Sequence, residues 1–415
     1  MPRIRRFGTT LLAAAALGLS FTPAATAAPA HHGCTSSVPF ISGSEGYDTF
    51  RIPAVARAAD GSLVAFAEGR RDSAGDSGAI RTVSKTSRDG GCTWGPLTVV
   101  DSNGDNTAGN PTPVVARDGE LVLLTVHNGP VSEAQIVSGT ASAQDTRRVF
   151  VSSSSDNGRT WTSARDITAE SKLPTWRWYA TGPGHATLLR HGPHAGRIVV
   201  PANHSSAPPA GSTDFGTEAK YYGGHDLYSD DNGHTWHIGF TDGVIAANET
   251  SMTELPTGAL YFTSRNQGSA ADHRADGYSF DGGKTLVRPY QVQPGTSGTK
   301  VEGSVLQTTI PWLLLYSGPA DPATRAVMQL RLSSDGGRTW HPGRTLTSNP
   351  AGYSDLVQAD PATVGLLDET ADRRAVRKRG VPAHPAFRRA LTHTSVLPCL
   401  GVRQDRGPGR KGARR

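Results

Sequence analysis

An octapeptide of the form Ser-x-Asp-x-Gly-x-Thr-Trp recurs along this chain and limits the folds that the chain can adopt. Four copies keep the final Trp and a fifth ends in Leu, and their aspartates are Asp89, Asp156, Asp231, Asp281 and Asp335. The intervals between successive aspartates are 67, 75, 50 and 54 residues. Internal repeats with a spacing of this order indicate propellers, solenoids or arrays. We therefore expect a chain built from repeated structural units.

The residues of the octapeptide suit a tight turn between two antiparallel strands. The Asp side chain can accept hydrogen bonds from backbone N–H groups a few residues later, and Gly permits a positive φ. Thr begins the outgoing strand, and Trp buries a large apolar surface. Nothing in this pattern requires catalysis, so we interpret the five copies as folding elements on the outside of each unit.

The rest of the composition favours an all-β chain. There are 48 Gly and 28 Pro residues, which is typical of a chain rich in turns. Short apolar or alternating runs predict strands, for example at residues 62–67, 121–126, 197–200, 260–263 and 312–316. No long amphipathic helix is predicted.

The first 27 residues have the features of a signal peptide. Three arginines precede a short apolar run at residues 9–21, and small residues up to Ala27 form a cleavage pattern. The apolar run is shorter than the roughly 20 residues that span a bilayer. We therefore expect cleavage after Ala27 and a secreted protein without membrane insertion.

Export would permit disulfide bonds among the three cysteines. Cys34 opens the mature chain and Cys92 lies inside the first octapeptide, so that a bond between them would fix the N-terminus to the first unit. The sequence alone leaves this pairing open. Cys399 would then remain without a partner.

The net charge of +6 comes from the two ends of the chain. Residues 371–415 hold 13 Lys and Arg against Asp372 and Asp405, and the leader adds three arginines, which leaves residues 7–370 at −8. A basic face for nucleic acid is therefore not indicated, and we expect no nucleic-acid partner. The Arg/Pro/Gly-rich composition of residues 371–415 predicts a disordered tail.

The segment Phe50-Arg51-Ile52-Pro53, followed by the octapeptides, resembles the sialidase (exo-α-neuraminidase) family, in particular its secreted bacterial members. The octapeptides correspond to the family's Asp boxes, and the resemblance runs from about residue 38 to residue 370. It implies a six-bladed β-propeller and makes residues 28–370 the catalytic domain.

The resemblance implies a site for the carboxylate of a sialic acid. Family members use three arginines from distant blades, and the motif register matches them to Arg51, Arg265 and Arg325. A planar guanidinium suits this role because it binds carboxylate oxygens at two points and stays charged.

The same register implies the catalytic residues. Tyr353 matches the family's nucleophile, a phenol that avoids repulsion from the substrate carboxylate. Its usual pKa near 10 requires a base, and Glu249 matches that partner. The general acid is expected in the loop after Arg70, where Asp76 matches the family spacing and Asp72 remains the alternative.

Four further residues are assigned by the resemblance. We expect Arg70, Asn110 and Tyr179 to contact the sugar or line its pocket, and Glu369 to orient Arg51 from behind. The chain departs from the usual pattern at Asp368, where an aromatic residue is common, and at Asn110, where many relatives have Asp.

The tail also departs from the family. Sialidases continue past the position of Glu369 with a further alternating strand, and no such pattern follows here. We therefore expect an incomplete final blade and a tail that does not pack on the propeller. The sequence leaves two explanations, a shift of reading frame between about Asp368 and Arg379 or a genuine basic extension.

The sequence as a whole predicts a retaining exo-sialidase that acts as a monomer on terminal α-linked sialic acids of sialylated glycans. No cofactor or metal is implied. The alternatives are a trans-sialidase, which would share these residues, and a propeller that binds sialoglycans without cleaving them.

Overall fold

The computed structural model describes residues 34–243, 246–268, 272–371 and 391–398, the last segment by its backbone. The predicted signal peptide, residues 1–27, lies outside these ranges. Within them the helices are short, namely α1 (Glu133–Ser138), α2 (Thr168–Ser171), and the 3-10 turns η1 (Gly192–His194) and η2 (Ala219–Tyr221). No helix among these residues is long and apolar enough to cross a membrane. The prediction of an all-β chain is confirmed.

The described strands form six antiparallel blades, which we number in chain order. Blade one holds β2 (Thr49–Arg57), β3 (Leu63–Arg70), β4 (Ile80–Ser87) and β5 (Thr98–Ser102). Blade two holds β6 (Thr107–Val115), β7 (Leu121–Asn128), β8 (Arg148–Ser154) and β9 (Arg165–Asp166). Blade three holds β10 (Trp176–Thr181) and β11 (Thr187–Leu188) beside β12 (Ile198–Ser206), β13 (Tyr222–Ser229) and β14 (His237–Asp242).

Of the remaining three blades, blades five and six share one long strand, β22. Blade four holds β15 (Ala247–Glu254), β16 (Leu260–Asn266), β17 (His273–Ser279) and β18 (Gln291–Ser297). Blade five holds β19 (Ser304–Gln307), β20 (Leu314–Pro319), β21 (Ala326–Ser333) and the first half of β22 (His341–Asp360). Blade six holds the second half of β22, β23 (Thr363–Thr370), β24 (Leu391–Pro398) and β1 (Ser36–Ile41).

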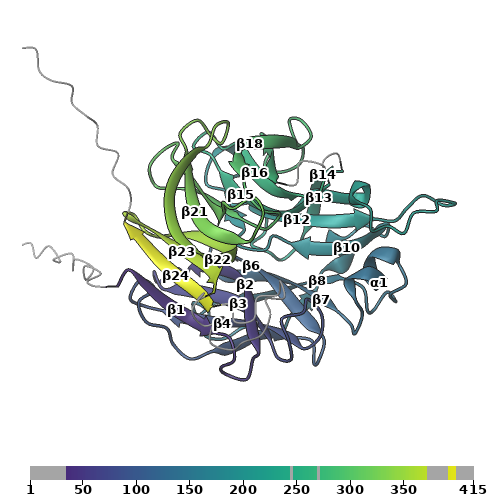
Figure 1. Ribbon diagram of the computed structural model, residues 1–415, viewed down its shortest axis with the longest axis horizontal. Coiled ribbons are helices and arrows are strands. Elements are labelled where there is room, and N and C mark those ends of the chain that lie inside the picture. The colour runs from purple at the N-terminus through teal and green to yellow at the C-terminus, as the bar shows by residue number, and fades with distance from the viewer. Residues whose placement is uncertain (1–33, 244–245, 269–271, 372–390, 399–415) are drawn as a thin grey trace, which may run out of the picture. The chain divides into compact units, whose positions relative to one another are not determined.

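The final blade is complete, which corrects the prediction made from the tail. β24 pairs with β23 from Thr370↔Leu391 to Thr363↔Pro398 and pairs with β1 on its other side. Figure 1 shows β24, in yellow, between β23 and the purple β1. The expectation that the whole of 371–415 stays off the propeller is therefore wrong for 391–398.

The correction has a physical reason in the backbone. The free edge of β23 presents unpaired N–H and C=O groups, and a ladder can satisfy them without strict alternation of apolar side chains. The segment Leu391–Pro398 contains Thr and Val, which favour strands. The reading-frame hypothesis rested on a missing strand and loses that support. Residues 372–390 and 399–415, with Cys399, lie outside the described residues.

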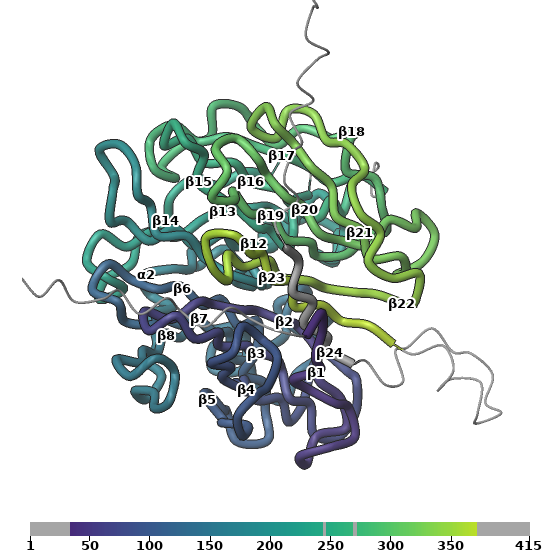
Figure 2. Tube along the Cα trace, turned by 90° about the vertical axis from the view of Figure 1, so that its left-hand side faces the viewer, coloured from purple at the N-terminus to yellow at the C-terminus, as the bar shows by residue number. Residues whose placement is uncertain are grey.

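The blades form a closed ring around their inner strands. The first strands of successive blades contact one another around the ring. β2 contacts β6, β6 contacts β10 and β11 of blade three, β11 contacts β15, β15 contacts β19, β19 contacts β22, and β22 contacts β2. In Figure 2 the colour passes from purple and blue at β2–β8 through teal at β12–β15 to green at β18–β21. Apolar side chains pack between neighbouring sheets, as Leu124 of blade two and Leu227 of blade three do. Side chains at one end of the inner strands therefore meet near a common axis.

The five octapeptides are turns that directly follow β4, β8, β13, β17 and β21, the third strands of their blades. In the first copy, Asp89 Oδ1 accepts hydrogen bonds from the backbone N–H of Cys92 at 3.1 Å and of Thr93 at 2.9 Å. The third strand of a blade is parallel to its first, so these turns lie at the end opposite to the start of the inner strands. Cys34 and Cys92 are joined by a disulfide bond, which ties the start of the described chain to the first turn.

Candidate active site

Bulges near the start of the inner strands place the candidate residues. The strand register shifts between Arg51 and Ala54 in β2, Gly109 and Thr112 in β6, Ala247 and Thr250 in β15, and Ala351 and Ser354 in β22. A bulge bends its strand and changes the direction of the side chains that it carries. Arg51, Asn110, Glu249 and Tyr353 all lie within these bulges. The four residues therefore come from different blades at the same end of the propeller.

The bulges in β2 and β6 are each stabilised by a hydrogen bond from a backbone amide to a buried glutamate. Ile52 and Asn110 both precede a proline and have a positive φ, of 57° and 53° respectively. The Ile52 N–H donates to Glu369 Oε1 at 2.8 Å. The Asn110 N–H donates to Glu68 Oε1, also at 2.8 Å. In each case a buried carboxylate satisfies an amide that the bulge has removed from the ladder.

Tyr353 and Glu249 form the centre of the site. The Tyr353 hydroxyl donates a hydrogen bond to Glu249 Oε1, and both residues are buried. Arg265 Nη1 donates to Glu249 Oε2 at 2.8 Å and lies 3.4 Å from the Tyr353 hydroxyl oxygen. Burial raises the pKa of Tyr353 well above its usual value, and the Glu249 charge adds to this while the arginine charges oppose it. The free protein therefore holds a neutral phenol whose proton is directed at a carboxylate.

Arg51 connects this pair to two carboxylates. Its Nη2 donates to Glu369 Oε2 at 3.3 Å, and its Nη1 lies 3.4 Å from Asp76 Oδ1. Its Cζ lies 5.2 Å from the centroid of the Tyr353 ring. Burial alone would lower the pKa of Arg51, but the charges of Glu369 and Asp76 outweigh this effect and raise it. The guanidinium is therefore held in place while it remains fully charged.

The structure brings Asp76 to the arginines. Asp76 Oδ1 accepts from Arg70 Nη1 at 2.7 Å, and 67% of the Asp76 side chain remains exposed. Burial alone would raise the pKa of Asp76, but the charges of Arg70 and Arg51 outweigh this effect and lower it. Among the described residues Asp72 forms no side-chain hydrogen bond or ion pair. Of the two candidates, Asp76 is the one in contact with the rest of the site.

Arg70 holds the loop that carries Asp76. It is 2% exposed, and its Nε donates to Glu68 Oε2 at 3.0 Å. Its Nη1 also donates to the backbone carbonyls of Ala74 at 2.6 Å and Gly75 at 3.0 Å. The guanidinium is thus already engaged by protein groups. The local carboxylate and the loop carbonyls thus fix the position of the guanidinium, and its contact with the sugar stays a prediction.

Arg325 completes a group of three arginines around Tyr353. It immediately precedes β21, its Cζ lies 5.7 Å from the Tyr353 ring centroid, and its Nη2 donates to the Lys300 carbonyl at 3.4 Å. Arg51, Arg265 and Arg325 come from blades one, four and five, whereas Tyr353 belongs to blade six. Three guanidinium groups at one place can bind a carboxylate through charge-assisted hydrogen bonds.

Two residues that form hydrogen bonds with Asn110, namely Arg147 and Glu68, were not predicted from the sequence. Arg147 Nη1 donates to Asn110 Oδ1 at 3.1 Å, and Arg147 Cζ lies 4.1 Å from the centroid of the Trp178 ring. Burial lowers the pKa of Arg147, although the charge of Glu68 opposes this effect. Nothing in the local sequence marks Arg147 or Glu68 as part of the site.

Tyr179 does not line the site, and that prediction is wrong. The residue is fully buried, and its ring packs against Trp176 and His225 with centroid distances of 6.3 and 4.9 Å. Consecutive residues of a strand point to opposite faces. Trp178 therefore takes the face toward Arg147, and Tyr179 takes the face toward the core between blades.

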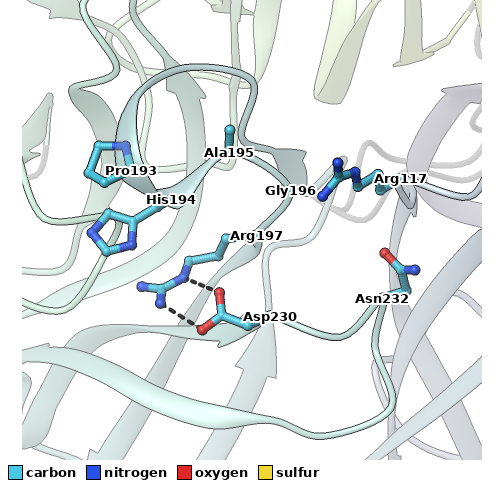
Figure 3. Close-up of a pocket in the computed structure, with 8 residues that line it drawn as sticks. All are labelled: Arg117, Pro193, His194, Ala195, Gly196, Arg197, Asp230 and Asn232. Atoms are coloured by element: carbon cyan, nitrogen blue, oxygen red, sulfur yellow. Dashed lines mark hydrogen bonds and ion pairs between the residues drawn. The ribbon is translucent and has the colours of Figure 1, made fainter.

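A polar cavity of about 330 Å³ lies at a different place on the surface. Its lining includes Arg117, His194 and Asn232, together with Arg197 and Asp230. Arg197 binds both oxygens of Asp230 at 2.7 Å, and Figure 3 shows this pair with Arg117 and His194 to either side. The cavity shares no residue with the group around Tyr353, so it is not part of the candidate active site.

Comparison with known proteins places this arrangement in a family. Residues 61–366 match the family described as BNR repeat-like domain. A sialidase of Micromonospora viridifaciens is 30% identical over 345 residues, which cover 79% of this chain and 51% of that protein. An exo-alpha-sialidase of Aspergillus fumigatus is 28% identical over 383 residues, which cover 84% of this chain and 87% of that protein. The chain thus spans about half the length of the first relative and most of the second.

Solved structures support the fold. The Hadza microbial sialidase Hz136 superposes with a TM-score of 0.71 at 22% identity, over 88% of this chain and 68% of that one. The intramolecular trans-sialidase of Ruminococcus gnavus superposes with a TM-score of 0.68 at 17% identity, over 87% of this chain and 96% of that one. At these identities the likeness concerns the propeller fold. By its match over residues 61–366, this chain belongs to the BNR repeat-like domain family, and its curated relatives are sialidases.

Proposed function

We propose that this chain is a retaining exo-sialidase that removes terminal α-linked sialic acids from glycoproteins, glycolipids or oligosaccharides. The observation that carries the proposal is the Tyr353 hydroxyl bonded to Glu249 inside a group of three arginines. The sialidase relatives support the same assignment.

In this proposal the arginines bind and orient the substrate. The carboxylate of the sialic acid is held by Arg51, Arg265 and Arg325, which places the adjacent anomeric carbon near the Tyr353 hydroxyl. Glu369 keeps Arg51 in position by accepting hydrogen bonds from it and from the neighbouring Ile52 amide. Because the arginines lie on three different blades, the rigid propeller fixes their relative positions.

The first chemical step forms a bond between Tyr353 and the sugar. The tyrosine oxygen attacks the anomeric carbon while its proton passes to Glu249, the carboxylate that already accepts it. The bond from the anomeric carbon to the glycosidic oxygen breaks, and Asp76 gives its proton to that oxygen. A phenol suits the attack because a carboxylate would be repelled by the carboxylate of the substrate.

The second step returns the protein to its starting state. Asp76, now ionised, takes a proton from water as the water oxygen attacks the anomeric carbon. The bond to Tyr353 breaks, and the tyrosine oxygen recovers its proton from Glu249. Two displacements at one carbon give net retention of configuration.

The charges around Asp76 predict how the reaction depends on pH. In the free protein, burial favours protonation of Asp76, but Arg70 and Arg51 prevail and hold its pKa low. A substrate carboxylate on Arg51 would cancel part of this positive charge and raise the pKa of Asp76, so that it becomes a better proton donor. Because kcat/KM reports on the free enzyme, we expect it to rise as the pH is lowered toward the acidic range.

The activity can be tested with a fluorogenic α-sialoside, in the presence and absence of lactose. A hydrolase releases the fluorophore and free sialic acid, and lactose leaves the product unchanged. Formation of sialyllactose as the main product would instead identify a trans-sialidase. Binding of the sialoside without any release would identify a binding protein and refute the enzymatic proposal.

We also propose that the protein is exported and loses residues 1–27. The bond between Cys34 and Cys92 supports this, since disulfides persist mainly in oxidising compartments. Mass spectrometry of the protein from the culture medium of a secreting host should find an N-terminus directly after Ala27. Retention of the intact protein in the cytoplasm would contradict export.

A further inference from the structure

A second cavity, of about 410 Å³, lies between two of the octapeptide turns. Residues of the turns after β17 and β21 line it, including Phe280 and Arg338, and Trp312, Tyr278 and His191 contribute further wall. We call it the Asp-box cavity. The octapeptide turns follow third strands, whereas Tyr353 and its neighbours lie near the start of first strands. The Asp-box cavity is therefore at the opposite end of the propeller from the candidate active site.

Phe280 is an exposed aromatic residue at a position that is polar in every other copy of the octapeptide. The corresponding residues are Arg88, Ser155, Asp230 and Ser334. The Phe280 side chain does not compensate by packing inward, because the residue is 71% exposed. The turn forms without an aromatic residue in four cases, so folding of the turn does not account for Phe280.

Trp312 is a second exposed aromatic residue of the cavity wall, and its backbone is strained. Its φ of 66° is rarely adopted by a bulky side chain, and 41% of the residue is exposed. Its ring lies close to the turn after β21, since a Cβ added to Gly336 would lie 3.6 Å from Trp312 Cζ3. A large residue kept in a strained and exposed position is more easily explained by a ligand than by folding.

Polar groups accompany the two exposed rings of Phe280 and Trp312. Arg338 is exposed, and in the described part of the chain its guanidinium forms no ion pair. The His191 side chain is 51% exposed and its Nδ1 lies 3.2 Å from Glu254. A cavity with aromatic surface and a few hydrogen-bonding groups is typical of a small-molecule site, and about 410 Å³ lies within the usual range for such sites.

We propose that the Asp-box cavity binds a neutral hexopyranose unit of a glycan. A pyranose ring has an apolar face of C–H groups and a rim of hydroxyls. The apolar face would pack against Phe280 and Trp312, and the hydroxyls would bond to Arg338 and His191. The site is separate from the sialic acid site and requires no catalysis. It would hold the protein on a glycan-bearing surface while the opposite end acts on another chain.

The test uses lactose and methyl β-galactoside as probes. Saturation-transfer NMR measures their binding to the full protein. Phe280→Ser introduces the residue found in two other copies of the octapeptide, and Trp312→Gly relieves the positive φ, so both variants should fold. Each should weaken binding of the probes at least tenfold. Phe215→Ser, which alters a 74% exposed phenylalanine outside the cavity, is the matched control and should bind as the wild type does.

Activity and association state complete the experiment. All three variants should hydrolyse a small soluble sialoside at the wild-type rate, which separates this proposal from the proposed function. Lactose binding that neither cavity substitution affects would overturn the proposal, because the sugar would then bind elsewhere. The proposal would also be overturned if the wild type formed a dimer in sedimentation velocity, both cavity variants were monomers, and none of the proteins bound the sugar probes. The cavity would then be a contact between copies of the chain.

Discussion

The buried carboxyl group of Asp368, in strand β23 of blade six, allows a quantitative prediction of how stability depends on pH. The residue is 4% exposed, and burial together with the neighbouring Glu369 charge raises its pKa from 3.8 to about 8. In the unfolded chain the carboxyl group would titrate near its ordinary value. Between these two values the unfolded chain binds fewer protons than the folded protein. The free energy of unfolding should therefore fall as the pH rises through this window.

The size of the effect follows from the same values. Each pH unit inside the window costs about 1.4 kcal/mol of stability for one group, so raising the pH from about 5 to about 7.5 should remove about 3 kcal/mol. Asp368→Asn cannot ionise and should lack this contribution. Urea unfolding of both proteins at the two pH values gives the difference directly, because titration of all other groups cancels.

The control for this experiment is Asp105→Asn. It makes the same Asp-to-Asn change at a side chain that is 87% exposed, and it should reproduce the wild-type dependence on pH. If the wild type and Asp368→Asn lose stability in parallel between the two pH values, Asp368 is not held neutral in the folded protein. The reasoning from burial and from the Glu369 charge would then be wrong.

Three further predictions concern the candidate active site. Arg51→Lys keeps the charge but loses the two-point contact, so kcat/KM should fall by the equivalent of a few kcal/mol, and a near-normal value would exclude Arg51 as a carboxylate ligand. Glu369→Gln weakens the support of Arg51 by roughly 1.5–3 kcal/mol, which should appear as a ten- to hundredfold loss of kcat/KM on α-sialosides with the fold retained by circular dichroism. Asp76→Ala should slow substrates with poor leaving groups far more than activated aryl sialosides, whereas Asp72→Ala should not; the opposite pattern would make Asp72 the acid.

The repeated turns could be predicted because their interactions are local. Asp335 bonds the Thr339 amide at 2.9 Å and Ser333 bonds Asp335 at 2.8 Å, all within one octapeptide. The position of Cys92 inside such a turn also made its bond to Cys34 a reasonable possibility. Interactions of this kind leave a pattern in the sequence itself, and the all-β propeller followed from repeating that pattern.

The residues of the candidate site are far apart in the sequence, so local patterns alone do not identify them. The motif register identified Arg51, Tyr353 and Glu249, and the structure brings them together although Arg51 and Tyr353 are about 300 residues apart. The bulges that orient them could not be seen, because a bulge is defined by the pairing of two strands. Glu68 and Arg147 were missed for the same reason, since each is identified by its contact with Asn110.

The two errors have distinct causes. For Tyr179, resemblance to a family does not decide the face of a strand to which a side chain points, and here the ring faces the core. The basic composition of the tail favours disorder, but the open edge of β23 offers hydrogen-bonding partners that composition does not reveal, and β24 pairs there. A basic, Pro-rich sequence can still supply eight residues to a ladder when the neighbouring strands provide the hydrogen-bonding partners.

The most direct test of the account is covalent labelling with a fluorinated sialoside that traps the glycosyl-enzyme. Mass spectrometry of the digested protein should find one label, on a peptide containing Tyr353, and Tyr353→Phe should remain folded and unlabelled. The label is expected on the tyrosine oxygen because that atom donates its proton to Glu249 and is surrounded by arginines. A label on any other residue, or equal labelling of Tyr353→Phe, would contradict the proposed nucleophile.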